Sequence, residues 1–308
     1  MAGWTARDIP PQRGRVALVT GATGGIGFEV ARALAAAGAE VLFAVRDRGK
    51  AEAAMACVAG ETPGARLGFV PLDLGELRSV RGCAEEVAAR HPALHLLVNN
   101  AGVMALPTRR LTADGFERQL GVNFLGHFAL AARLLPLLRT ATSPRVVTVT
   151  SLAYRFGRLR FEDLQGERKY RPWRAYAQSK LAALSFALEL QRRSDRGGWG
   201  VASIAAHPGW AMTNLYANGP ASEGATPLLL RLMRRATRLF SHSAEIGARP
   251  LLFAATAAEA RPGGHYGRCR LCELRGPPAP ARITAAARDE VAAARLWQAA
   301  EALTGTRF

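Results

Sequence analysis

A doubly wound α/β fold, with a mainly parallel seven-stranded sheet and helices on both faces, is what this sequence predicts. Apolar segments of strand length alternate with helical patterns, and that alternation favours a parallel sheet. The 308 residues, 49% of them hydrophobic, are enough to bury a large core. The predicted strands cover residues 16–20, 40–45, 67–72, 94–99, 144–150, 200–206 and 264–267.

The two ends of the chain are expected to lie outside this alternation. Residues 1–14 are predicted to form a short polar arm. The proline-rich segment 276–280 breaks the chain and precedes an Ala-rich helix over about 284–303. We expect the C-terminal extension, from about 277 to 308, to pack on the core. Residues 1–308 are therefore predicted to form a single domain.

The first strand leads directly into a glycine-rich turn. Residues 16–20 have the pattern of a buried parallel strand, and residues 28–37 that of a helix closed by Gly38. In such a strand–turn–helix unit, glycines let backbone N–H groups approach a pyrophosphate at the helix N-terminus. A dinucleotide site is therefore favoured over an ordinary loop. Its predicted binding residues are Gly21, Thr23, Gly25, Ile26 and Gly27.

A tyrosine and a lysine stand four residues apart in the segment Tyr176-Ala177-Gln178-Ser179-Lys180. On a helix they project from the same face, one turn apart. A free phenol has a pKa of about 10, and a nearby ammonium lowers that pKa by favouring the phenolate. The pair is therefore a candidate proton-transfer device. Alone, this spacing occurs by chance in many surface helices.

The glycine spacing together with Tyr176 and Lys180 resembles the short-chain dehydrogenase/reductase family. Further segments match motifs of that family in the same order, which is hard to obtain by accident. They are Leu72-Asp73-Leu74, Asn99-Asn100-Ala101-Gly102, Asn123, Ser151 at the end of the strand 146–150, and Pro208-Gly209 followed by Thr213. The resemblance implies a Rossmann fold and a carbonyl–alcohol oxidoreductase with a nicotinamide cofactor.

The resemblance also implies roles for these residues. Tyr176 protonates the substrate oxygen in reduction, Lys180 lowers the pKa of the tyrosine and binds the nicotinamide ribose, and Ser151 holds the carbonyl oxygen. Asn123 supports a water that relays protons to the lysine. The cofactor-binding residues, besides the glycine turn, are Asp73 and Leu74 beside the adenine, Asn100, Ala101 and Gly102 of the central motif, Tyr176 and Lys180, and Pro208, Gly209 and Thr213 beside the nicotinamide.

Cofactor preference depends on the end of the second strand. Relatives that prefer NAD place an acidic residue there, which accepts hydrogen bonds from the ribose 2′-OH. Val45 occupies that position here, and Arg46 follows it, while Asp47 comes one or two positions too late. A guanidinium pairs well with a 2′-phosphate, so the sequence predicts NADP(H). The alternative is that Arg46 is a solvated loop charge.

Within the family the chain most resembles the retinol dehydrogenase-like reductases. It shares with them residues 161–165, a long stretch between Ser151 and Tyr176, and the tail after Arg295. A substrate lid is expected over about 210–242. Its predicted helix, 227–240, is apolar on one side and carries arginines on the other. It could cover a lipophilic substrate, such as a retinoid, steroid, long-chain aldehyde or ketone, or rest on an anionic membrane.

The net charge of +17 comes from 41 Lys and Arg against 24 Asp and Glu. Such a field attracts anions, including NADPH and anionic lipids, although a G+C-rich genome would also favour arginine. No compact basic tract interleaves with aromatics, so no nucleic-acid partner is expected. No signal peptide and no apolar run of about 18 residues was found in the sequence, and a cytoplasmic protein, peripheral at most, is predicted.

The cysteines do not form a disulfide framework for a domain of this size. Cys269 and Cys272 form a lone C-x-x-C pair without a second pair or suitably spaced histidines, so no metal site is expected. Two alternatives remain open. A nucleotide-binding sensor or scaffold of this fold would lack turnover, although intact Tyr176 and Lys180 favour an enzyme. The resemblance implies a homodimer, which the C-terminal extension could alter.

Overall fold

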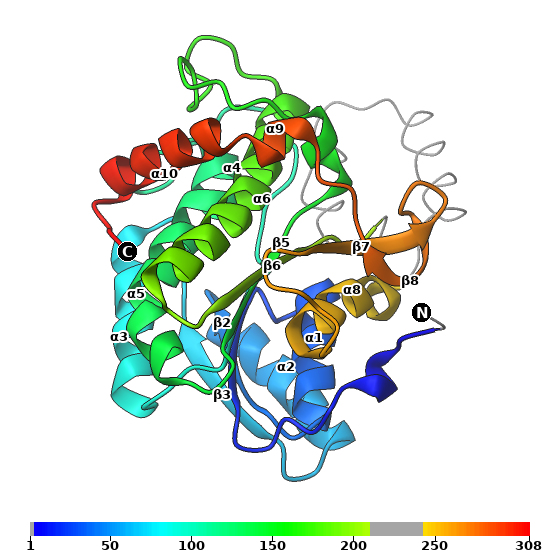
Figure 1. The fold of residues 1–308 in the computed structure, drawn as a ribbon. Helices are drawn as coiled ribbons and strands as arrows, with labels where there is room; N and C mark the ends of the chain where they lie inside the picture. Colours follow the sequence, from blue (N-terminus) through cyan, green and yellow to red (C-terminus); the bar gives the residue numbers. More distant parts are fainter. Residues whose placement is uncertain (1–2, 210–242) are drawn as a thin grey trace, which may run out of the picture.

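One mixed sheet organises the chain (Figure 1). The computed structural model describes residues 3–209 and 243–308, in which eight strands have the order β3-β2-β1-β4-β5-β6-β7-β8. The strands pair in parallel from β3 to β7, and β8 is antiparallel to β7. They are β1 (Val16–Thr20), β2 (Glu40–Val45), β3 (Arg66–Pro71), β4 (Leu96–Asn99), β5 (Arg145–Val149), β6 (Ala202–Ala206), β7 (His265–Arg270) and β8 (Arg275–Pro280).

Helices cover both faces of this sheet, as the sequence predicts. In Figure 1, α1, α2 and α8 lie on one face, and α3, α5, α6 and α10 lie on the other. The helical segments are η1 (Ala6–Asp8), α1 (Gly25–Ala36), α2 (Arg48–Glu61), α3 (Leu77–Arg90), α4 (Arg118–Leu120), η2 (Gly121–Leu125), α5 (Gly126–Thr140), η3 (Leu152–Phe156), α6 (Pro172–Gly197), α8 (Ala244–Thr256), α9 (Ala285–Arg288) and α10 (Glu290–Thr304).

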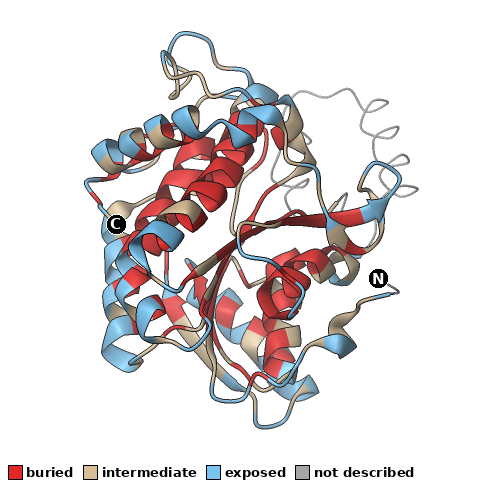
Figure 2. Ribbon diagram, in the orientation of Figure 1, coloured by how far each residue is buried: buried red, intermediate tan, exposed pale blue. Residues whose placement is uncertain are grey.

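The central strands are buried on both faces, which explains why they are apolar at nearly every position (Figure 2). Along β1, Ala17 and Val19 pack with the helices α1 and α8, whereas Leu18 packs with α3 and α5. Two apolar layers therefore sandwich the sheet. The strands predicted at 16–20 and 40–45 are confirmed residue for residue, and the others up to β6 to within two residues.

The prediction of seven strands was one too few, and the segment 276–280 does not break the chain. These residues belong to β8, the edge strand that pairs with β7 in the register Tyr266↔Pro280 and Arg268↔Pro278. Proline lacks an N–H, but an edge strand uses only one of its two sides for pairing. Strand β8 therefore extends the sheet into the stretch that the sequence assigned to the C-terminal extension.

The N-terminal arm is less polar in its contacts than the sequence suggests. The ring of Trp4 meets that of Phe253 edge to face, with centroids 5.5 Å apart. Thr5 and Asp8 form a capping box around the short helix η1. The described part of the arm is thus attached to α8 rather than free in solvent.

The C-terminal helix packs on the core, as predicted. Trp297 of α10 is buried, and its ring lies 5.0 Å from Phe128 of α5 and 5.8 Å from Phe186 of α6. The helix begins with the side chain of Asp289 capping Ala292 N and ends at Gly305 in the left-handed conformation. It lies across α5 and α6, so the surface formed by these helices is partly covered by α10 (Figure 1).

One helical stretch among the described residues, Arg118–Thr140, is long and apolar enough to cross a membrane by length and composition alone, although polar residues interrupt it. Of its most apolar window, 78% is buried inside the fold. Its residues, including Phe124 and Phe128, pack between the sheet and α6. Its apolar character is that of a core helix.

Trp297 tests how far the fold depends on α10. Replacing it with Ala removes a buried indole from between Phe128, Phe186 and Phe308. We expect Trp297→Ala to lower the free energy of unfolding by about 3–5 kcal/mol, as measured by urea denaturation. Val291→Ala, on the same helix but 81% exposed, is the matched control and should change it by less than about 0.5 kcal/mol. Equal effects of the two variants would contradict this role.

Candidate functional site

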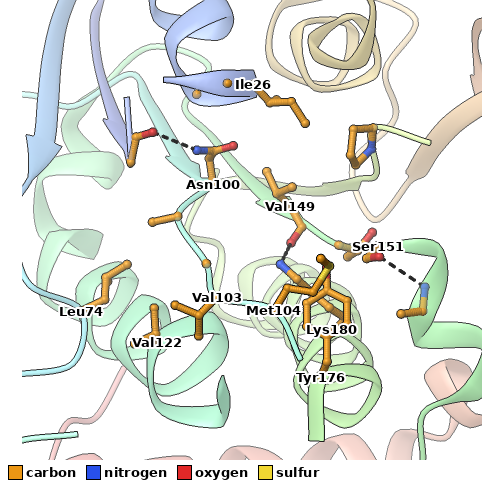
Figure 3. Close-up of a pocket in the computed structure, with 18 of the residues that line it drawn as sticks. Ile26, Leu74, Asn100, Val103, Met104, Val122, Val149, Ser151, Tyr176 and Lys180 are labelled. Atoms are coloured by element: carbon orange, nitrogen blue, oxygen red, sulfur yellow. Dashed lines mark hydrogen bonds between the residues drawn. The ribbon is translucent and has the colours of Figure 1, made fainter. Parts of the chain in front are cut away.

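A cavity of about 850 Å³ opens at the carboxyl ends of the parallel strands. It lies where the strand order changes direction between β1 and β4, the place where open α/β sheets bind ligands. Its walls come from the segments that follow each of the strands β1 to β6, together with α6 and the β7–β8 connection (Figure 3). Of the predicted site residues that the structure describes, all but Asn123 line it.

Thr213 and the predicted lid, including its helix 227–240, lie outside the described residues. Asn123 lies in the described part but behind the cavity wall. The sites predicted from scattered segments are therefore brought together in one place by the fold, with those exceptions.

The glycine turn follows β1 and passes directly into α1. Gly21 and Gly25 have φ values of 69° and 57°, a region that favours glycine. A Cβ on Gly27 would collide with the Gly21 carbonyl oxygen and with Asn100 Nδ2. At the start of α1 the cap residue Gly24 has no side chain to bind the first N–H groups. These donors are therefore left for a ligand, as in a phosphate-binding turn.

Asn100 and Thr20 hold this turn against the end of β4. Asn100 Nδ2 donates to Thr20 O at 2.8 Å, and Thr20 Oγ1 accepts from the backbone N of Asn100 and of Ala101, both at 2.9 Å. The Asn100 amide and the Thr20 hydroxyl therefore hold the loop after β1 and the loop after β4 together. Asn100 lies at the cavity (Figure 3), but its side-chain nitrogen is used by the hydrogen bond to Thr20 O.

Arg46 lies where β2 ends, at the end of the cavity away from Tyr176. Its Nη1 lies 3.7 Å from Asp73 Oδ2 of the segment after β3, and the two side chains are 64% and 40% exposed. Asp47 is the N-cap of α2, and the hydrogen bond from Lys50 N to its Oδ1 lowers the pKa of its carboxyl. Asp47 is therefore used to cap a helix. Lys50, which the sequence analysis missed, also lines this end.

Tyr176, Lys180 and Ser151 meet at the other end of the cavity (Figure 3). Pro172 occupies the first position of α6, where its missing N–H is not needed, and Tyr176 and Lys180 are both buried one turn apart on this helix. Lys180 is buried, and its Nζ donates to Val149 O at 3.0 Å. Burial lowers the pKa of Lys180 to about 8. The Ser151 Oγ accepts from Ala153 N at 3.3 Å, at the start of η3.

Asn123 lies in a π-helical turn, η2, between α4 and α5. Its side chain accepts from Val103 N at 2.8 Å and donates to Val103 O and Ser179 Oγ, each at 2.9 Å. π-Helical turns are rare and occur frequently at functional sites. The side chain of Asn123 therefore fastens the loop after β4 to α6, directly beside Lys180.

A cluster around Glu273 was missed by the sequence analysis. Glu273 Oε2 lies 2.7 Å from His207 Nε2, and its Oε1 lies 2.6 Å from Arg155 Nη2. His207 Nδ1 accepts from Gly209 N at 3.1 Å, so the proton of the neutral ring is on Nε2 and is donated to Glu273. In the sequence, Glu273 is one charged residue in a short segment and carries no further signal. In the structure it lies in the β7–β8 turn, where Leu271, Cys272 and Glu273 have positive φ.

This cluster joins three walls of the cavity. His207 precedes Pro208 and Gly209, Arg155 belongs to the η3 helix that Ser151 caps, and Glu273 lies in the β7–β8 turn. Burial on its own would raise the pKa of Glu273, but the hydrogen bonds from His207 and Arg282 N and the charge of Arg155 bring it down to about 2. Burial lowers the pKa of His207, which keeps its ring neutral.

Apolar side chains surround the Tyr176 end. Met104 packs against Tyr176, with Ala153 beside them. Phe156 and Trp173, which are 84% and 50% exposed, and Leu274 complete this part of the lining. The end opposite Arg46 is thus suited to an apolar ligand.

A nucleotide-type cavity at the switch point of a doubly wound sheet defines the class of this protein as a nucleotide-binding α/β protein. The model of the family described as short chain dehydrogenase matches residues 15–223. The chain therefore belongs to the short-chain dehydrogenase/reductase family, which uses NAD(P), and it is a dehydrogenase acting on CH–OH groups. The predicted family is confirmed.

Similar proteins extend along nearly the whole chain. Polyprenol dehydrogenase of Mus musculus is 45% identical over 302 residues, covering 96% of this chain and 86% of that protein. Retinol dehydrogenase 12 of Homo sapiens is 38% identical over 309 residues, covering 100% and 92%. The crystal structure of an uncharacterized protein from Mycobacterium paratuberculosis is 39% identical with a TM-score of 0.81, covering 100% and 99%. The resemblance to retinol dehydrogenases is confirmed.

The charge on Glu273 gives a pH-dependent prediction. Because its folded-state pKa is about 2 and an unfolded glutamate has a pKa of about 4.3, its contribution to stability is present above pH 4.3 and is lost as the pH falls toward 2. We expect Glu273→Gln to lower the free energy of unfolding by about 1–2 kcal/mol at pH 6, and the difference from the native chain to shrink by pH 3.

Urea denaturation at both pH values measures this difference. Glu162→Gln, an exposed carboxylate with no ion pair among the described residues, is the matched control and should leave stability unchanged at either pH. A Glu273→Gln effect of the same size at pH 6 and pH 3 would show that the charge of the carboxylate does not stabilise the cluster.

Proposed function

We propose that this protein interconverts a carbonyl and an alcohol on a lipophilic substrate, with NADP(H) preferred over NAD(H). The observation that carries the proposal is that Tyr176, Lys180 and Ser151 line one end of the cavity whose other end holds the glycine turn. The apolar lining around Met104 and Trp173 supports a lipophilic substrate. The names of similar proteins, retinol and polyprenol dehydrogenase, point to the same class, and retinoids, steroids, long-chain aldehydes and ketones belong to it.

The glycine turn and α1 fit a dinucleotide pyrophosphate. Gly21, Gly25 and Gly27 leave no Cβ in the way, and the free N–H groups at the start of α1 supply donors. Asp73 and Leu74 would hold the adenine end, Gly102 and Ala101 the middle, and Pro208 and Gly209 the nicotinamide end. When bound, the nicotinamide supplies or accepts the hydride.

The charges at the end of β2 support NADP(H), rather than NAD(H), as the preferred cofactor. Arg46 is the guanidinium at this position, and Lys50 lies on the same wall, whereas Asp47 is occupied as the cap of α2. If the adenosine ribose binds at this end, these two cations would attract a 2′-phosphate dianion. A carboxylate there would be needed to accept hydrogen bonds from an unmodified 2′-OH.

The roles of the polar groups follow from their positions. In reduction, the Tyr176 hydroxyl donates its proton to the substrate oxygen as that oxygen gains negative charge, and the ammonium of Lys180 stabilises the phenolate that remains. The Ser151 hydroxyl donates a hydrogen bond to the same substrate oxygen. Asn123 connects the loop after β4 to α6 through Val103 and Ser179. Because Ser179 precedes Lys180, this position supports the proposal that a proton path past Asn123 reaches Lys180.

We place the protein in the cytoplasm, with peripheral membrane contact through 227–240 and homodimer formation as further parts of the proposal. All four cysteines are free thiols, and Cys83 is buried in the core, which fits a reducing compartment.

Tyr176→Phe tests the proton donor. The substitution removes only the hydroxyl, so the fold and the cofactor site should persist. We expect kcat/KM for reduction of retinal or a medium-chain aldehyde with NADPH to fall by about 10³-fold, while the Kd for NADPH changes by less than about twofold. Tyr170→Phe is the matched control, since its hydroxyl bonds Leu106 O and Gln119 away from the cavity. A Tyr176→Phe enzyme with normal kcat/KM would contradict the assignment.

Arg46→Asp tests the cofactor preference. It replaces the cation at the end of β2 by a carboxylate that repels a 2′-phosphate and can accept from a 2′-OH. We expect the Kd for NADPH to rise by about 30-fold or more and the Kd for NADH to stay the same or fall, as measured by fluorescence titration. Arg48→Asp makes the same charge change on a 68% exposed side chain outside the cavity. NADPH binding that is equally affected in both variants would contradict a specific role for Arg46.

A further inference from the structure

A second cavity, of about 360 Å³, lies beside the first. It is formed by the long connection between η3 and α6, the stretch that separates Ser151 from Tyr176, and by the first turns of α6. Phe156 lines both cavities, so the second one opens next to the Tyr176 end of the first. None of the catalytic or cofactor-binding residues proposed above lines it.

The lining of this second cavity is strongly cationic. Among the residues that the structure describes, none of its cations forms an ion pair with a carboxylate. Other exposed arginines of the described surface do form such pairs, as Arg48 does with Glu52 and Arg90 with Glu86. The cations are Arg158, Arg160, Lys169, Arg171 and Arg174.

The two carboxylates in the lining are occupied by backbone groups. Glu117 accepts from Gln119 N at 2.9 Å and Leu120 N at 2.8 Å, and burial raises the pKa of its carboxyl. Asp163 Oδ1 accepts from Glu167 N at 2.7 Å and from Arg168 N at 3.2 Å. Five cations face these two carboxylates in the lining, so a net positive field remains in the cavity.

The cavity walls are held in place without a ligand. Buried Gln178 accepts from Arg160 N at 3.0 Å and donates to Leu164 O at 2.9 Å. The hydroxyl of Tyr170 donates to Leu106 O at 2.8 Å and accepts from Gln119 Nε2. The N-terminus of α6 lies at the same cavity, and its cap residue Arg171 provides no side-chain acceptor for the first N–H groups.

We propose that this cavity is a binding site for a phosphate monoester, held by Arg158, Arg171 and Arg174 beside the entrance to the active site. Guanidinium groups bind phosphate through paired N–H donors, and a dianion relieves the mutual repulsion of the cations. A volume of about 360 Å³ accommodates a phosphate and a short part of the group that carries it. The phosphate could belong to a soluble ester or to a lipid headgroup, and the inference does not depend on the proposed substrate.

Binding of two probes tests this site. The protein is saturated with NADPH throughout, so that the dinucleotide site cannot bind the probe. Glycerol 3-phosphate is titrated by calorimetry, and vesicles of phosphatidylcholine with and without phosphatidic acid are tested by co-sedimentation. Arg158→Gln/Arg171→Gln/Arg174→Gln is compared with Arg66→Gln/Arg133→Gln/Arg139→Gln, which removes the same charge from exposed arginines elsewhere.

The native chain is expected to bind at least one probe. The cavity variant should lose at least about tenfold in affinity and the control variant less than about twofold, with NADPH binding intact in both. Binding of glycerol 3-phosphate would assign a soluble ester, and binding only to phosphatidic acid would assign a lipid headgroup. Failure of both probes, or equal losses in the two variants, would overturn the proposal. If the triple variant does not fold, Arg174→Gln against Arg139→Gln gives the same comparison.

Discussion

The buried ammonium of Lys180 is the group on which the arrangement of the site depends. Its Nζ reaches the Val149 carbonyl at the end of β5, and burial lowers its pKa to about 8. The folded state therefore binds this proton less tightly than the unfolded chain does, and the residue lowers stability at neutral pH. Perturbed groups of this kind cluster at functional sites. Most of the length of α6 is buried against the sheet and α10, and this burial stabilises the fold and offsets the loss of stability at Lys180.

Polar side chains hold the loops around that ammonium. Thr20 and Asn100 join the ends of β1 and β4, and Asn123 joins the next loop to α6. Glu273, in the β7–β8 turn, likewise connects the segment after β6, through His207, to the helix η3, through Arg155. Where these groups are buried, the contacts satisfy donors and acceptors that would otherwise be costly to bury. The cavity is thus shaped by hydrogen bonds between strand ends, and the apolar layers supply the stability.

Much of this was predictable from local patterns. A strand buried on both faces must be apolar, so β1 and β2 could be located to the residue, and the glycine turn and the Tyr176–Lys180 spacing depend on short segments. Strand β8 was missed because its prolines signal a break, and only its place at the sheet edge makes them acceptable. The Glu273 cluster was missed because Arg155, His207 and Glu273 are far apart in sequence and meet only in the fold. The cations of the second cavity all come from residues 158–174, but no local pattern shows that this connection folds around a hollow.

The pH dependence of kcat/KM for carbonyl reduction, compared between the native chain and Lys180→Gln, tests the central claim most directly. If the ammonium lowers the pKa of the Tyr176 phenol, the alkaline limb of the native profile should lie below the value of about 10 for a free phenol. In Lys180→Gln that limb should move to a higher pH by at least about one unit, and kcat/KM should be lower than in the native chain. Identical alkaline limbs in the two enzymes would contradict the claim that Lys180 controls the proton donor.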